Sequence, residues 1–257
     1  MRQKILYSLG VCALALTFAL PQVASARNLY SIIVADTNYG TIGTSVEGDF
    51  NHVRKKMQEV ANYIGLDLKE ISIKGNSNKP SLLLESLRNA PITNDDIVVF
   101  YYSGHGYRTN NKGSSPWPNL YFSTPDQGVK YETIITSLNN KHPRFLLTMV
   151  DVCNSFIPDN GAPPLVTRDN FSAAQSSRIK TNYQHLFLES VGSINITSSS
   201  AGEKAYGYND GGLYTNAFLN TLTSMVNSKS TVQWNAILDR AASLVNQQEH
   251  PYFELHI

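Results

Sequence analysis

The chain has 257 residues, with 21 lysines and arginines against 20 aspartates and glutamates, and a net charge of +1. Charged residues make up only 16% of the chain, so it has neither the basic surface typical of nucleic-acid binding nor an acidic tail. A hydrophobic content of 42% is ordinary for a globular protein with a buried core. We therefore expect one or two globular domains and no nucleic-acid partner.

The N-terminal segment, residues 1–26, has the features of a signal peptide. Two basic residues precede an almost purely apolar run from Ile5 to Leu20, and Ala24-Ser25-Ala26 is a small-x-small cleavage sequence. The alternative is an uncleaved membrane anchor, which the short apolar run argues against. We expect export to the periplasm or the outside of the cell. No other run is long enough to span a bilayer, so the mature chain, 27–257, is expected to lack an integral membrane segment.

Strands and helices alternate along the mature chain, with no linker between two cores. Apolar runs and alternation predict strands at 29–35, 68–73, 97–102, 145–150 and 193–197, with a terminal edge strand at 251–257. Helical spacing of apolar residues predicts helices at 46–64, 80–88, 131–138, 213–226 and 232–245. Residues 107–119 and 154–182 are rich in polar residues, Gly and Pro and are expected to be loops. The pattern predicts one α/β domain with a mostly parallel sheet flanked by helices.

Two short motifs stand where two of these strands end. The run 97–102 leads into Ser103-Gly104-His105-Gly106, and the run 145–150 leads into Asp151-Val152-Cys153-Asn154-Ser155. Ligands and chemistry gather at the carboxyl ends of strands in open α/β sheets. A thiol beside an imidazole is the minimum requirement for a cysteine nucleophile. We therefore expect His105 and Cys153 to face one another and to be catalytic.

The cysteine content supports this expectation. The chain has two cysteines, and Cys12 lies in the predicted signal peptide, so the mature chain keeps only Cys153. A single thiol cannot form an internal disulfide, and it is a liability in an oxidising compartment unless it has a function. The alternative is a buried core cysteine, since a thiol packs like a small hydrophobic group. The His-Gly motif favours catalysis.

The two motifs resemble those of caspase-like cysteine peptidases (clan CD, peptidase family C14), most closely metacaspases and their bacterial relatives. Asn38-Tyr39 and the segment from Gly212 to Leu219 also match the family pattern. The resemblance implies a three-layer sandwich around a central, mostly parallel six-stranded sheet. It also implies a cysteine endopeptidase acting on a peptide or protein.

The resemblance implies a role for each residue of the two motifs. His105 would act as general base or ion-pair partner, and later as the acid for the leaving amine. Cys153 would be the nucleophile and would form a thioacyl-enzyme. The backbone N–H groups of Gly106 and Cys153 would form the oxyanion hole. No third side chain is assigned, because the family usually orients its histidine through the backbone.

A substrate pocket is also implied by the resemblance. Asp151 and Ser198 are expected in an S1 pocket for arginine or lysine. The second acid of the metacaspase pocket is missing at its expected place, where His52 stands, with Asp49 at the position of a cysteine. Val46 stands where caspases carry a pocket arginine. A basic P1 residue is nevertheless favoured; the alternative role for Asp151 is to fix the turn at the strand end.

The predicted loop 154–182 lies where the family has its processing segment. Arg168, Arg178 and Lys180 are therefore candidate self-cleavage sites. Some metacaspases require Ca²⁺, and Asp126 lies in the loop region where such ligands occur, so activation by Ca²⁺ stays open, although no stretch of this chain has the ligand spacing of a calcium loop. We predict no metal site and no cofactor.

A second function stays open. The departures at His52 and Val46 suggest a catalytically inactive member of the same fold that serves as a binding or scaffold protein. Retention of both His105 and Cys153 argues against it. The sequence does not indicate an oligomeric state.

Overall fold

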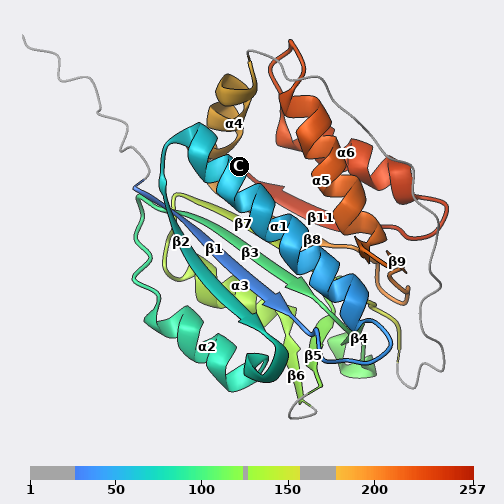
Figure 1. The fold of residues 1–257 in the computed structure, drawn as a ribbon. Coiled ribbons are helices and arrows are strands. Elements are labelled where there is room, and N and C mark those ends of the chain that lie inside the picture. The colour runs from blue at the N-terminus through green and yellow to red at the C-terminus, as the bar shows by residue number, and fades with distance from the viewer. Residues whose placement is uncertain (1–26, 124–126, 157–177) are drawn as a thin grey trace, which may run out of the picture.

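The structure is a computed structural model that describes residues 27–123, 127–156 and 178–257 (Figure 1). A six-stranded sheet with the order β11-β8-β7-β3-β1-β2 forms its centre. All pairs in this sheet are parallel except that of β8 with β11 at the edge. The predicted mostly parallel six-stranded sheet is thus confirmed. Its strands are β1 (Asn28–Ala35), β2 (Asp67–Lys74), β3 (Ile97–Ser103), β7 (Phe145–Asp151), β8 (Gly192–Thr197) and β11 (Tyr252–His256).

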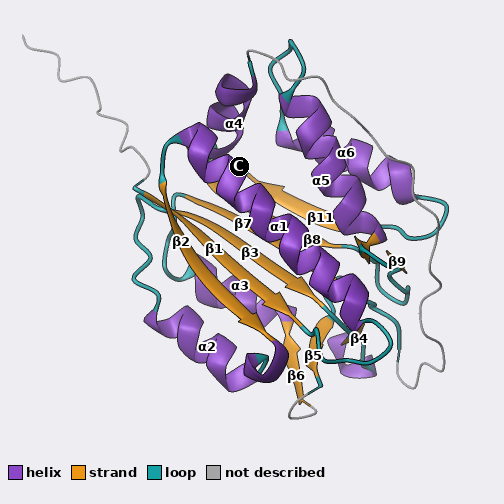
Figure 2. Cartoon of the chain, in the orientation of Figure 1, coloured by secondary structure: helices purple, strands orange, loops and turns teal. Residues whose placement is uncertain are grey.

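Helices cover both faces of the sheet and complete a three-layer sandwich (Figure 2). One face carries α1 (Gly43–Ile64), α4 (Ile179–Leu188), α5 (Leu213–Val226) and α6 (Trp234–Val245). The other face carries α2 (Pro80–Asn89) and α3 (Tyr131–Asn139). The two helical layers leave the carboxyl ends of the parallel strands open, where the chain turns into loops.

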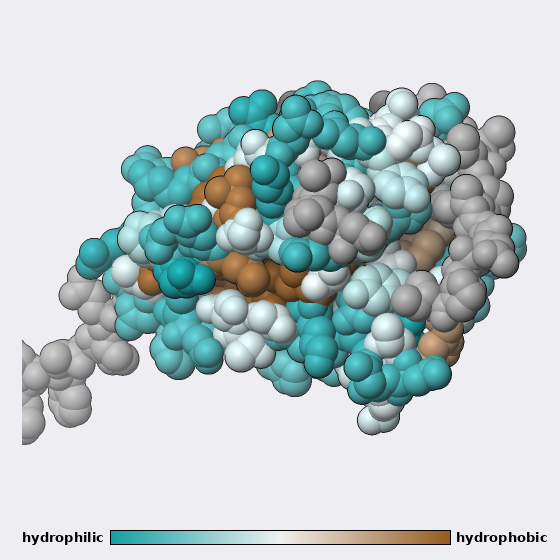
Figure 3. Space-filling view, turned by 90° about the horizontal axis from the view of Figure 1, so that it is seen from below, coloured by the Kyte–Doolittle hydropathy of each residue, from teal (hydrophilic) through white to brown (hydrophobic). Residues whose placement is uncertain are grey.

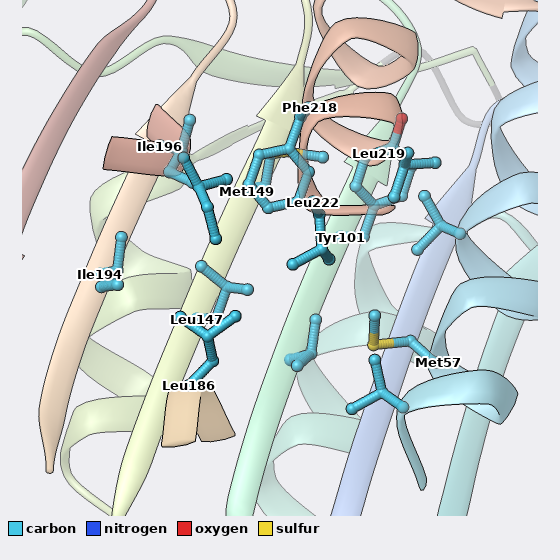
Figure 4. Close-up of a cluster of buried hydrophobic side chains, with 14 of the residues drawn as sticks. Met57, Tyr101, Leu147, Met149, Leu186, Ile194, Ile196, Phe218, Leu219 and Leu222 are labelled. Atoms are coloured by element: carbon cyan, nitrogen blue, oxygen red, sulfur yellow. The ribbon is translucent and has the colours of Figure 1, made fainter. Parts of the chain in front are cut away.

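The core is divided by the sheet into two apolar clusters. Along β1, Ile33 packs into one cluster, while Ile32 and Val34 pack into the other, as the two-residue period of a strand requires. Figure 4 shows the first cluster, in which Met57 of α1 and Leu147 of β7 lie with side chains from β3, α4, β8 and α5. Burial on both faces explains why the central strands read as continuous apolar runs.

Two helix boundaries follow directly from single residues. Gly65 ends α1 with a left-handed φ of 76°, and its N–H donates to the carbonyl of Ala61. Pro80 begins α2, where its missing N–H costs no helical hydrogen bond. Both boundaries are as predicted.

The predicted loop 107–119 needs correction, because small strands flank it. A second, three-stranded antiparallel sheet is formed by β4 (Gly106–Tyr107), β5 (Asn119–Phe122) and β6 (Gln127–Lys130). A single helical turn, η2 (Asn110–Lys112), lies between the first two strands. Strands of two to four residues lack the apolar run that identifies a buried strand, so the sequence pattern did not reveal them.

The predicted loop 154–182 is also too long, because α4 begins at Ile179. Its apolar side chains, among them Tyr183 and Leu186, pack into the core beside α1. Asn182, predicted to lie in the loop, is buried and donates from Nδ2 to the carbonyl of Val226 at 3.0 Å. The polar residues between these positions hid the helical spacing. The predicted signal peptide, Asp126 and Arg168 lie outside the described residues.

The surface of the described part of the chain is mixed. Figure 3 shows one face that is mostly hydrophilic and is crossed by a band of hydrophobic residues. The large hydrophobic residues that are exposed lie on different segments, so exposure of this kind needs no special explanation. None of the helices in the described residues combines the length and apolar character required to cross a membrane.

Candidate active site

The two sequence motifs meet at the carboxyl ends of neighbouring strands. Strand β3 pairs with β7 in parallel, and Ser103 at the end of one strand lies opposite Asp151 at the end of the other. His105 and Cys153 each follow two residues later. Both line one pocket of about 250 Å³, whose wall also includes residues from α1 and from segment 205–212. The structure therefore brings the predicted histidine and cysteine to the same cleft.

The chain beyond His105 runs against the chain beyond Cys153. A Cβ placed on Gly106 would lie 2.4 Å from the carbonyl oxygen of Cys153 and 2.6 Å from Cβ of Val152. Two residues further, the N–H of Arg108 donates to the carbonyl of Ser155 at 2.7 Å. Position 106 is therefore restricted to glycine by contact with the cysteine segment.

Aromatic and acidic residues surround the imidazole of His105. The ring of Tyr39 meets it edge-on, with 4.2 Å between ring centroids, and Tyr121 lies at 6.4 Å. Burial lowers the pKa of His105 below its usual 6.5, and the negative charge of Asp36 opposes that shift. Within the described residues, Nε2 of His105 is buried without a hydrogen-bond partner. A neutral imidazole with an open nitrogen is suited to accept a proton.

Asp36 is a site residue that the sequence pattern did not single out. It follows β1 directly and is 1% exposed. Its two carboxylate oxygens accept hydrogen bonds from the backbone N–H and the hydroxyl of Ser123, at 3.1 and 2.7 Å. Cβ of Asp36 also packs under the backbone of Gly104, beside His105. Its place at the carboxyl end of a parallel strand, just before Asn38-Tyr39, was the available indication.

The segment around Cys153 is held by the residue that follows the cysteine. Sγ of Cys153 lies 3.8 Å from the carbonyl oxygen of Ala205, across the pocket. Asn154 is fully buried, and its Nδ2 donates to the carbonyl of Pro116 at 2.7 Å. Its Oδ1 accepts from Nη1 of Arg108 at 3.2 Å. These bonds fix the backbone on which the thiol stands.

Two buried carboxyls, Asp49 and Asp151, lie side by side in the pocket wall. Asp151 accepts from the N–H and the hydroxyl of Thr215 at 3.0 and 2.6 Å. Asp49 accepts from the hydroxyl of Ser103 at 2.6 Å and from the N–H of Gly212 at 2.7 Å. The sequence comparison placed no acid beside Asp151, whereas the structure places one there, Asp49. Asp49 lines the pocket and His52 does not, because α1 turns the first of these positions toward it.

Burial and mutual repulsion shape the charge of this pair. Burial raises the pKa of Asp49 well above its usual value, and the neighbouring carboxyl of Asp151 adds to the rise. Burial also raises the pKa of Asp151, while hydrogen bonds from Thr215 hold it down in part. Two like charges this close do not both ionise freely. A cation entering the pocket would favour the ionised pair.

The remaining predicted site residues lie outside the pocket wall. Ser198 is fully buried behind Asp151, where its hydroxyl accepts from the N–H of Val152 at 3.1 Å. Arg178 stands at the start of α4 and donates to the carbonyl of Lys229 at 2.7 Å. Lys180 lies in the first turn of that helix. Val46, by contrast, lines the pocket as an apolar residue.

Within residues 27–123, 127–156 and 178–257, no group of three or more His, Cys, Asp or Glu side chains is arranged to hold a metal ion. The acidic pair is thus not part of a metal-ligating cluster in the described chain.

Comparisons with known proteins agree with this geometry. Residues 32–256 match the model of the caspase domain, peptidase family C14. Among solved structures, the chain is similar to caspase-1 from Spodoptera frugiperda, with 12% sequence identity and a TM-score of 0.56. That likeness covers 95% of this chain and 94% of the insect protein, and at this identity it shows the fold alone. The search of curated proteins found no match.

Proposed function

This chain belongs to the caspase-domain family of cysteine peptidases, and on that premise we propose that it is an endopeptidase that cleaves after arginine or lysine through Cys153 and His105. One observation carries the proposal: the thiol, the imidazole and two buried carboxyls line the same pocket. The first two groups supply the chemistry, and the carboxyls supply a preference for a cation.

The chemical steps follow from the environment of each group. His105 takes the proton from Sγ of Cys153, and the sulfur attacks the carbonyl carbon of the scissile peptide. The tetrahedral intermediate then breaks its C–N bond, and His105 returns the proton to the leaving amine. Water hydrolyses the resulting thioester. The lowered pKa of His105 favours a neutral base in the resting enzyme over the expected ion-pair partner.

The oxyanion is assigned to backbone donors. The N–H groups of Gly106 and Cys153 belong to two segments in van der Waals contact, which supports a hole preformed for the oxyanion. Packing of Asn154 against Pro116 and Arg108 holds the cysteine side of this hole.

The preference for a basic P1 residue rests on Asp49 and Asp151. Both face a pocket that is otherwise apolar on the side of Ile42 and Val46. The methylene groups of an arginine or lysine pack on such a wall, while the cationic end meets the carboxyls. An aspartate at P1 would bring a further carboxyl group beside this pair and is disfavoured.

A peptide library tests this proposal, with the Cys153→Ala variant as the blank. We expect cleavage after arginine or lysine by the wild-type protein and no cleavage by the variant. Cleavage after aspartate would overturn the assignment of the pocket, and cleavage by Cys153→Ala would overturn that of the nucleophile.

Autoprocessing is proposed at Arg168, Arg178 or Lys180. Lys180 lies in the first turn of α4, so cleavage after it requires this turn to unfold locally. We expect two fragments from the wild-type chain and one intact chain from Cys153→Ala, separated by gel electrophoresis. An intact wild-type chain with full activity contradicts the idea.

The alternative, an inactive scaffold protein, predicts an unreactive thiol. Labelling with iodoacetamide or with a peptidyl electrophile carrying arginine distinguishes the two functions. Selective labelling of Cys153 supports the enzyme, since a catalytic thiol is more reactive than an ordinary buried one. Absence of labelling in folded protein supports the scaffold.

Export through the signal peptide, to the periplasm or beyond the cell, is proposed together with this activity. N-terminal sequencing of protein recovered outside the cytoplasm tests it, with Arg27 as the expected first residue. Activity is proposed to need no cofactor, and treatment with a chelator is expected to leave the cleavage rate unchanged.

A further inference from the structure

A third buried carboxyl lies behind the pocket described above. Glu249, in the segment between α6 and β11, is 1% exposed. It interacts with the backbone N–H of Tyr214 in the first turn of α5, the same turn that donates to Asp49 and Asp151. Helix N-termini carry unpaired N–H groups and a partial positive charge, which carboxylates stabilise. Three segments far apart in the sequence thus place one carboxyl each at the start of α5.

Glu249 also holds the pocket wall. Its Oε2 accepts from the N–H of Tyr206 at 2.8 Å, and Tyr206 lines the pocket. The carbonyl of Tyr206 in turn accepts from the N–H of Leu213 at 2.8 Å, which ties the wall to α5. The residue therefore touches both structures that hold the acidic pair.

The bond to the wall leaves part of Glu249 unused. Its Oε1 is buried without a hydrogen-bond partner in the described part of the chain, and so is the hydroxyl of Tyr214. The hydrogen bond to the pocket wall uses only Oε2. Holding the wall therefore does not explain why Oε1 is buried as well. Buried polar atoms without partners are rare in native proteins and call for an explanation.

Asp151 acts electrostatically on both of the other carboxyls. Burial raises the pKa of Glu249 well above its usual value, and the charge of Asp151 adds to the rise. Burial, followed by the charges of Asp151 and Glu249, raises the pKa of Tyr214. Other titratable groups on the surrounding elements include Asp49 of α1, Tyr101 of β3, and Glu203, Lys204, Tyr206 and His250 of the flanking segments.

We propose that Glu249 is the third carboxyl of the specificity pocket, and that a cationic P1 side chain binds there with release of protons from Asp49, Asp151 and Glu249. The inference rests on the proposed function, because it takes this pocket as the P1 site. Because burial and the charge of Asp151 raise the pKa of both Asp49 and Glu249, the three carboxyls do not all ionise in the empty pocket. The positive charge of an arginine or lysine replaces the bound protons, which leave the carboxyl oxygens for solvent, and no covalent bond of the substrate changes in this step.

Calorimetry on the Cys153→Ala protein tests proton release directly. Two peptides are titrated that differ only at P1, with arginine in one and its uncharged isostere citrulline in the other. The pH runs from 5.5 to 8.5, in buffers of different ionisation enthalpy. We expect affinity for the arginine peptide to rise with pH, by up to about tenfold per pH unit for each proton released, and its binding enthalpy to depend on the buffer. The citrulline peptide is expected to show neither effect.

The Glu249→Gln variant tests the part played by the third carboxyl. Glutamine keeps an oxygen that accepts from Tyr206 but does not titrate in this range. We expect the variant to release fewer protons when the arginine peptide binds. Its affinity should still increase with pH, but the increase should begin at a lower pH than in the parent protein, because Asp151 no longer has the like charge of Glu249 beside it. The matched control is Glu189→Gln, because that carboxylate is 69% exposed and lies outside the pocket. The affinity of this control for the arginine peptide is expected to depend on pH as that of the parent protein does.

Each outcome is decisive. An arginine peptide that binds better than the citrulline peptide, but with no dependence on pH or buffer, overturns the inference and leaves the proposed function standing. A Glu249→Gln curve that coincides with the parent curve removes Glu249 from the pocket. If neither peptide binds, both the inference and the proposed function fail.

A second measurement covers the case in which Glu249→Gln does not fold. Carbon-13 carboxyl spectra of glutamate-labelled Cys153→Ala protein follow protonation with position 249 intact. We expect one glutamate signal to titrate above the usual range and to move toward its ionised position when the arginine peptide is added. The absence of any such glutamate signal overturns the inference.

Discussion

Replacing Gly106 by alanine is the sharpest test of how the two motifs cooperate. The added Cβ would lie 2.4 Å from the carbonyl oxygen of Cys153, about 1 Å short of the 3.4 Å at which ordinary contact begins. The second obstacle is Cβ of Val152 at 2.6 Å. The backbone of Cys153 and the branched side chain of Val152 have little freedom to move. The segments that carry His105 and Cys153 must therefore separate by about 1 Å.

That displacement sets the expected loss of activity. A misplacement of about 1 Å costs about 100-fold in rate, and the loss of one oxyanion donor costs about 100- to 1,000-fold, or about 2.7–4 kcal/mol in transition-state free energy. We therefore expect kcat of Gly106→Ala to fall by about 100- to 1,000-fold, with KM nearly unchanged because the acidic pair is untouched. Overpacking is expected to lower the free energy of unfolding by about 1–3 kcal/mol.

A fluorogenic peptide with arginine at P1 measures both constants, well below the melting temperature of the variant. Gly40→Ala is the matched control: it lies in the loop before α1, and its new Cβ would meet no atom within 4 Å. We expect wild-type kinetics from this control. A Gly106→Ala enzyme with kcat within threefold of wild type would refute the idea that the close approach of the two segments builds the oxyanion hole.

Three further predictions concern charge. Asp151→Asn should lower kcat/KM for arginine substrates by about 100-fold or more, yet leave the alkylation rate of Cys153 within threefold; equal losses in both assays would contradict its place in the pocket. In Asp36→Asn, the pKa of His105 should fall further, because the negative charge that raises it is gone. The acid limb of the kcat/KM profile should therefore move to lower pH, and movement to higher pH would contradict the reasoning. Asp49 has a folded pKa above its unfolded one, so its protonated form favours the folded state, and this contribution is lost as pH rises through the folded pKa. Thermal melts should show that Asp49→Asn becomes more stable relative to wild type as the pH is raised from 5 to 8. A difference in melting temperature that stays constant over this range would count against a raised pKa of Asp49.

The central strands were predictable from the sequence because they are buried on both faces. In β3 and β7 every residue is buried, so each reads as an uninterrupted apolar run. Helix α1 was predictable for a similar reason: its core side chains recur at helical spacing, and Gly65 marks its end. Short or half-polar elements escaped detection. The strands β4, β5 and β6 have two to four residues each, and α4 has only ten residues and carries a polar residue, Asn182, on its buried face.

The acidic pocket shows why the site was only partly predictable. Asp151 precedes Cys153 in one motif and was found with it. The sequence does not single out Asp49, because comparison by position assigns the place of the second acid to His52, three residues further along α1. A shift of three residues leaves a side chain on nearly the same face of a helix, and only the placement of α1 against β3 and the segment 205–212 decides which one reaches the pocket.

The order of elements, the two motifs and their meeting at neighbouring strand ends were thus determined by the sequence itself, because apolar runs and strand-end residues are local features that survive without neighbours. The tertiary structure alone decided that Asp49, Asp151 and Glu249 converge on the first turn of α5. Burial and like charge perturb a carboxyl only through groups that the fold brings near it, and these three lie about 100 residues apart along the chain. The hydrophobic pattern of the sequence does not predict that these three carboxyls converge, because their convergence depends on strand order and helix packing together.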